Sequence, residues 1–262
     1  MQFRLRENSF RSLNAMRSHR ILQAPPVQPL ESFSSWISRL TLSQGTTRID
    51  MARHMGISLR GDVDWNNLFC EAKSVVLSQA GMAVDAFHQQ DLLLKALHFA
   101  VPCERALLKS GSWARYRYCP LCLSQQRAPH FAIYWRIASW RHCPVHECPL
   151  YEGCLHCGNA TTAPIDMLQV GLRRRGIVSL GKCAKCGRPL ADVTTVQAKS
   201  SPSVCAKQRD ALHCLSSLQT ALVKAQPQGF QANWVRLRRL LHDIWDIDRF
   251  TQVRSAQARL TR

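Results

Sequence analysis

Four close pairs of cysteine and histidine residues lie within Tyr118–Arg188 of this 262-residue chain. They are Cys119/Cys122, Cys143/His146, Cys154/Cys157 and Cys183/Cys186. Two residues separate the members of each pair, which is the ligand spacing found in tetrahedral zinc sites. A single pair would be weak support, whereas four pairs in one short stretch predict two metal sites.

Sequential pairing is the simplest arrangement of these ligands. Four protein ligands to each metal leave no open position for water, so each site would hold one structural zinc ion. A cross-braced arrangement, in which alternate pairs share a metal, stays open, as does replacement of a ligand by His142 or His156. Cys148 falls outside the pattern and is predicted to be a buried thiol. The sequential sites are Cys119, Cys122, Cys143 and His146, and then Cys154, Cys157, Cys183 and Cys186.

Known catalytic patterns do not surround these pairs. The chain has no His-Glu-x-x-His and no Gly-x-x-x-x-Gly-Lys-Ser/Thr segment, which removes support for a zinc protease and for ATP hydrolysis. A proline follows Cys119, whereas zinc deaminases place it before the cysteine. A redox role for the Cys-x-x-Cys pairs would be a poor explanation of all four ligand pairs. The sequence therefore predicts a protein that is not an enzyme.

The charge balance predicts a polyanionic partner. Lys and Arg number 35 against 17 Asp and Glu, a net charge of +18, which favours nucleic acid or a nucleoprotein. No stretch resembles a secretory signal or a membrane span, so a cytoplasmic location is expected. The candidate nucleic-acid contacts are Arg39, Arg48, Arg53, Arg60, Arg115, Arg117, Arg173, Arg174 and Arg175.

The elements that must position these residues are mostly helical. Ala52 four residues before Gly56 suits a helix-turn-helix, although a plain helical bundle explains the same stretch. The aromatic segment His130–Trp140 is expected to be helical, and Thr161–Val178 is expected to be a loop or the tip of a β-hairpin. Apolar spacing predicts helices over 31–42, 47–55, 70–79, 84–97, 205–224 and 233–250.

The predicted fold is mainly α with small zinc-bound α+β modules. A basic disordered arm is expected over 1–24, although its composition also imitates an organelle transit peptide. A helix-turn-helix-like helical domain over 25–117 and a tandem zinc-finger domain over 118–190 follow. A linker leads to a C-terminal helical segment over 204–252, and fraying is expected after Gln252.

Several of these segments, in this order, resemble the TniQ family over about residues 25–190. The resemblance implies a transposition accessory protein of the bacterial cytoplasm that selects the target, either DNA or a guide-RNA effector complex such as Cascade. It also implies recruitment of an AAA+ ATPase and the transposase, dimerisation in some members, and a zinc-ligand role for the eight paired residues. The matching segments are Leu30–Leu40, Tyr118–Cys122, Tyr134–Trp140, Cys143–His146 and Cys154–Gly158.

Two other classes of function remain open from the sequence. A stand-alone zinc-dependent transcription regulator would show the same metal pairs and the same positive charge. A nuclease would need a carboxylate cluster, which the few acidic residues do not suggest. The sequence does not distinguish direct DNA recognition from recruitment to a guide-RNA complex, and it does not give the oligomeric state.

Overall fold

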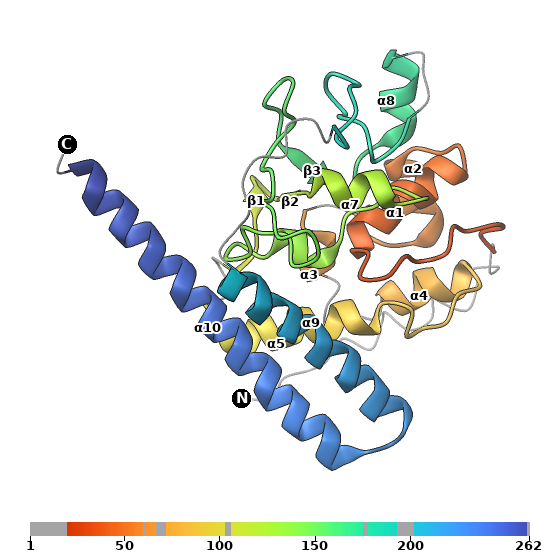
Figure 1. Ribbon diagram of the computed structural model, residues 1–262. Helices are drawn as coiled ribbons and strands as arrows, with labels where there is room; N and C mark the ends of the chain where they lie inside the picture. The colour runs from red at the N-terminus through yellow and green to blue at the C-terminus, as the bar shows by residue number, and fades with distance from the viewer. Residues whose placement is uncertain are drawn as a thin grey trace, which may run out of the picture.

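A computed structural model describes residues 20–59, 61–66, 72–102, 106–174, 178–192 and 202–260. The expected class, mainly α with small metal-binding modules, is confirmed, because helices dominate and the strands form one small sheet (Figure 1). Most of the predicted arm, Arg60, Arg175 and most of the predicted linker lie outside the described residues. None of the described helices is long and apolar enough to cross a membrane.

The N-terminal helices pack around Trp36, which is fully buried. The Ser32 side chain caps α1 (Phe33–Ser43), and the Thr47 side chain caps α2 (Arg48–Met55). Both helices agree with the spacing of apolar residues. After α2 the described residues form α3 (Val63–Asn66), which is a single helical turn, and then the longer helix α4 (Ala72–Gln79).

The second part of the fold begins with α5 (His88–Ala100) and a three-stranded antiparallel sheet. Its order is β1 (Lys109–Ser110), β2 (Trp113–Tyr116) and β3 (Thr161–Ala163). In the register, Ala114 lies opposite Ala163. The sheet therefore joins the chain before the first metal pair to the chain after the third.

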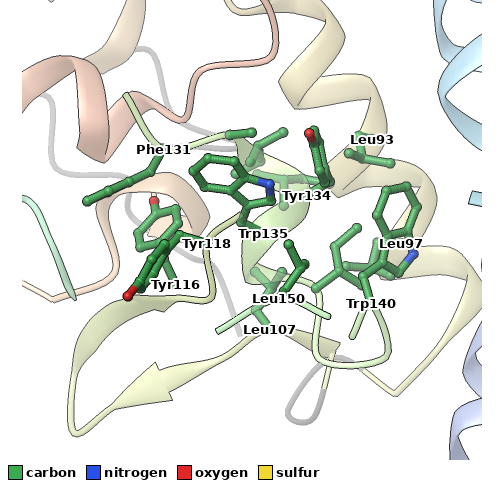
Figure 2. Close-up of a cluster of buried hydrophobic side chains, with 14 of the residues drawn as sticks. Leu93, Leu97, Leu107, Tyr116, Tyr118, Phe131, Tyr134, Trp135, Trp140 and Leu150 are labelled. Carbon is green, nitrogen blue, oxygen red and sulfur yellow. The ribbon is translucent and has the colours of Figure 1, made fainter. Parts of the chain in front are cut away.

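The helix predicted over His130–Trp140 is wrong. Only the 3-10 turn η3 (Ile133–Arg136) is present there, and isolated β-bridges pair Ala132 with Glu31 and Ile137 with Leu107. Apolar side chains in this stretch are buried on all sides, so their spacing did not reflect one helical face. Figure 2 shows Tyr134 and Trp140 beside Leu93 and Leu97 of α5, and Phe131 on the other side of Trp135, where its ring packs against that of Tyr116.

A buried polar network connects the two parts. Arg136 is fully buried and donates to Asp62 (2.8 Å) and Asp64 (2.7 Å). The Tyr116 hydroxyl donates to Asp64 (2.8 Å), and the Ser34 amide at the start of α1 donates to the same carboxylate (2.8 Å). Because each buried charge has a partner, this network fixes α1, α3, β2 and η3 relative to one another.

The expected loop or hairpin over Thr161–Val178 is also wrong in part. Residues 167–174 form the helix α8 (Met167–Arg174). Asp166 caps it by accepting a hydrogen bond from the Gln169 amide (3.1 Å). Met167 is buried and packs into the main core, so a local cap and one apolar anchor are enough to order this short helix.

The C-terminal segment is a hairpin of two long helices, α9 (Pro202–Val223) and α10 (Pro227–Leu260). In Figure 1 the pair lies along α5, and the C-terminal part of α10 extends beyond the body. Contrary to the expected fraying after Gln252, the helix continues to Leu260, because nothing in this stretch interrupts it. Buried residues of both helices, such as Leu215 and Leu241, belong to the same core as Trp135.

Candidate metal centres

Site one combines a helix start with a tight turn. Cys119 is the N-cap residue of α7 (Pro120–Gln125), so Cys122 lies one turn away on the same side. Cys143 and His146 come from the turn after Trp140. The Cys122 and Cys143 sulfurs are 3.6 Å apart, and His146 Nδ1 lies 3.5, 3.3 and 3.7 Å from the sulfurs of Cys119, Cys122 and Cys143.

Site two is made by two similar turns. The Cys154 sulfur lies 3.5 Å from that of Cys186, and the Cys157 sulfur lies 3.7 Å from that of Cys183. Zn–S bonds of about 2.3 Å in a tetrahedron place sulfurs about 3.8 Å apart. In each site the donor atoms all lie within 4.8 Å of one another. Both sets therefore fit one tetrahedral metal ion, and they group sequentially.

Three of the four half-sites share one backbone geometry, which we call the knuckle. In each, the amide of the first cysteine bonds to the carbonyl five residues later, at Cys148, Asn159 or Arg188. The amide four residues after that cysteine bonds back to the cysteine carbonyl. This fourth residue has positive φ in all three turns: Glu147 (51°), Gly158 (68°) and Gly187 (72°). Of the three, only Glu147 carries a side chain in this conformation.

The proton affinities of the thiols reflect their crowding. Hydrogen bonds to Cys122 and Cys143, and then burial, raise the pKa of Cys119. Hydrogen bonds from Cys119 and Cys122 lower the pKa of Cys143. In site two a backbone hydrogen bond at Arg188 lowers the pKa of Cys186 to about 7. One thiol of each cluster thus loses its proton readily. A bound cation is needed for the other donors to lose theirs as well.

The surroundings of the two sites differ. Tyr134 lies close to site one, and burial followed by the charges of Cys122, Cys143 and Cys119 raises the pKa of its hydroxyl. The Sγ of Cys148, buried as predicted, lies 3.5 Å from the Sγ of Cys119. At site two, Lys182 and Arg188 line a hollow of about 410 Å³ that reaches Cys183 and Cys186. Each site contributes two buried cysteines to the main core, and site two differs in that it also borders exposed charged residues.

The alternative histidine ligands lie outside both clusters. The Nε2 of His156 is 3.7 Å from an Asp192 carboxylate oxygen, and its Nδ1 is 3.3 Å from Arg188. His142 pairs through its backbone with Pro149 in a β-bridge. Each histidine therefore has other contacts in the part of the chain that the structure describes.

Most of the described candidate arginines are engaged within the fold. Arg39 pairs with buried Glu31 (2.5 Å). Arg48 lies 4.2 Å over the Trp113 ring and donates to the Leu59 carbonyl (3.0 Å). These two arginines hold α1 and α2 in place, and contact with phosphate would compete with those bonds.

Arg115 and Arg117 both bind Glu152, at 2.9 and 2.8 Å. Arg53 on α2 and Arg173 on α8 are exposed, although Arg53 also pairs with Asp50 (3.0 Å). Arg174 lies in α8, and its side chain is not among those described. A nucleic-acid role for the candidate arginines stays a prediction.

Sequence reasoning did not find two other groups of charged residues. One is Arg136 with Asp62 and Asp64, whose partners lie far apart in the chain. The other is Lys182, Lys185 and Arg188, which lie beside site-two ligands. Their position next to Cys183 and Cys186 was a usable signal, because residues between paired ligands must project from a tight turn.

Comparison with known protein families supports the resemblance. The sequence model of the TniQ family matches residues 22–150, which include all of site one and end before site two. The match is shorter than the expected 25–190, and α9 and α10 also lie outside it. A search of curated proteins gives no match. The chain belongs to the TniQ family through residues 22–150, and this membership implies a transposition-associated accessory protein.

Proposed function

We propose that this chain is a non-catalytic adaptor in transposition. It recognises a target, either DNA or a guide-RNA effector complex such as Cascade, and recruits an AAA+ regulator and the transposase. The observation that carries this proposal is the position of site one, which lies inside the TniQ-matched region and whose four donors are all protein atoms. A metal ion held by four protein ligands stabilises the fold around it and has no open coordination position for a substrate.

Each cluster holds one zinc ion in this proposal. Thiolates and imidazole are the donors that zinc prefers, and zinc bound by four protein ligands supplies structural cross-linking. At site one, Cys119 and Cys122 fasten the start of α7 to the knuckle of Cys143 and His146. At site two, the knuckle of Cys154 and Cys157, which lies just before β3, is fastened to the knuckle of Cys183 and Cys186.

The helical part supplies the surface for target and partner. On α2, Ile49 is 63% exposed and Arg53 is also exposed. The Arg53 charge and the net charge of +18 favour a nucleic acid or a nucleoprotein. A helix-turn-helix role for α1 and α2, a cytoplasmic location and a homodimer belong to the same proposal.

A reconstitution experiment tests this function. The purified chain is mixed with an AAA+ ATPase and a transposase of a transposon that carries a TniQ protein, with and without target DNA or effector complex, and co-elution is measured. The adaptor should co-elute with the ATPase, and the amount of this complex should increase when the target is present. Absence of ATPase binding under all conditions would overturn the proposal. A single tight operator, selected from random DNA without any need for the ATPase, would favour a transcription regulator.

A further inference from the structure

Four cations surround the last half-site of site two. Arg173 extends from α8, and Lys182, Lys185 and Arg188 lie on or next to the knuckle that starts at Cys183; we call these four the basic knuckle surface. All four side chains are exposed. In Figure 1, α8 lies at the opposite side of the molecule from the α9–α10 hairpin, so the hairpin does not cover this surface.

Two neighbouring hollows bring these cations together. Lys182 and Arg188 line the first, of about 410 Å³, and Arg173 and Lys185 line the second, of about 550 Å³. Val170 of α8 lines both hollows. The four charges therefore lie around two adjoining hollows where α8 meets the knuckle.

The acidic residues near this surface are fewer than its cations. Residues 150–192 contain six Lys and Arg but only three acids. Glu152 binds Arg115 and Arg117, and Asp166 accepts bonds from the amides at the starts of α2 and α8. In the described part of the chain, no acidic side chain forms an ion pair with Arg173 or Lys185.

Among the described residues, no aromatic side chain lines either hollow of this surface. Tyr151 is the only aromatic residue among residues 150–192, and its ring packs against that of Tyr118. Proteins that bind single-stranded nucleic acid combine positive charge with exposed aromatic rings. Positive charge without such rings fits the continuous phosphate backbone of a duplex.

We propose that the basic knuckle surface binds the phosphate backbone of double-stranded DNA. This inference rests on the proposed adaptor function and assigns its DNA contact to site two, outside the TniQ-matched region. The contact is independent of sequence, because phosphates carry no base information. The metal at site two would hold the knuckle so that its cations stay beside α8.

Binding of a fluorescent DNA duplex, measured by anisotropy over a series of salt concentrations, tests the inference. The test variant combines Arg173→Gln, Lys182→Gln and Lys185→Gln. The matched control combines Lys224→Gln, Arg236→Gln and Arg239→Gln, which removes the same charge from exposed positions on the hairpin side. Metal content and melting temperature are measured for both, and only variants that match the parent are compared.

The test variant should bind at least tenfold more weakly at 100 mM salt, and its salt slope should fall by about 0.9 for each phosphate that the protein no longer neutralises. The control should stay within about threefold of the parent, in keeping with removal of diffuse charge alone. Equal weakening in both variants would overturn the inference and leave the adaptor proposal intact. Preference of the parent for an RNA hairpin over the duplex would overturn the choice of DNA. Failure of the parent itself to bind the duplex at low salt would overturn both the inference and direct DNA recognition.

Discussion

The two metal centres have the same ligand spacing but occupy different kinds of surroundings. Site one is next to Tyr134, Trp135 and Trp140, which are buried in the main core (Figure 2). Site two borders two hollows and exposed cations. Both centres have two buried and two half-buried ligands, so the difference lies in what borders them. We therefore expect the first centre to support mainly the core and the second to shape a surface as well.

The attachment of the rest of the chain reinforces this difference. Arg209 of α9 donates to the Pro144 carbonyl (3.1 Å) and to Glu147 (2.6 Å), both in the site-one knuckle. Arg141 beside the same knuckle pairs with Asp248 of α10 (2.5 Å). The C-terminal hairpin is thus fastened to site one, and its stability should depend on that metal.

Removing one ligand from each site gives the largest expected contrast. Cys143→Ser should abolish the cooperative thermal transition, because structural zinc contributes about 10–16 kcal/mol in small zinc domains and whole proteins are stable by only about 5–15 kcal/mol. Cys183→Ser should keep that transition with one metal fewer per chain. Near-ultraviolet circular dichroism and metal analysis measure both, and a Cys143→Ser variant that melts like the parent would contradict the difference.

The buried network should have the next largest effect. Arg136→Met leaves Asp62 and Asp64 buried without their cation, which costs about 3–5 kcal/mol and should lower the urea midpoint strongly. Arg115→Met is the control, because its pair with half-exposed Glu152 is worth less than about 1 kcal/mol. Equal decreases of the urea midpoint in the two variants would mean that the network does not join the two parts of the fold.

Glycine in the site-two knuckles offers a smaller and more local test. At Gly158 a Cβ would meet no atom within 4 Å, so Gly158→Ala adds only the backbone cost of positive φ, about 1–2 kcal/mol. Metal affinity at site two should fall about tenfold, and the melting temperature of the core should remain unchanged. A competition titration with a chromophoric chelator measures the affinity, and a large decrease in core stability would speak against separate roles.

The smallest change is expected at the equivalent position of site one. Glu147→Gly relieves the strained φ of 51° but removes the partly exposed pair with Arg209. The two effects oppose each other, so the melting temperature should move by only a few degrees. A drop comparable to that of Cys143→Ser would show that the Arg209 contact is a main support of the knuckle.

Local features of the fold were predictable from the sequence, and long-range ones were not. The apolar spacing located α1 and α2, because this signal lies within a few turns of one helix. Ligand spacing, which is also local, located both clusters. The partners of Arg136 lie 72 and 74 residues away, and no local pattern indicates them.

The helix predicted over the aromatic segment His130–Trp140 was wrong for a different reason. Tyr134 and Trp135 are neighbours in the chain, and both are buried, so burial there does not follow a helical period. The β-bridges of Ala132 and Ile137 to distant residues hold the backbone instead. Periodicity reports a helix only where one face meets solvent, and this segment has no such face.

Stepwise removal of metal tests the central claim most directly. The chain is titrated with a zinc chelator while bound zinc, tryptophan fluorescence and near-ultraviolet circular dichroism are followed together. Two zinc ions per chain are expected, the first leaving with the core signals intact and the second leaving as the core unfolds. Fewer than two ions, or release of both in one step with the core, would contradict two centres with separate roles.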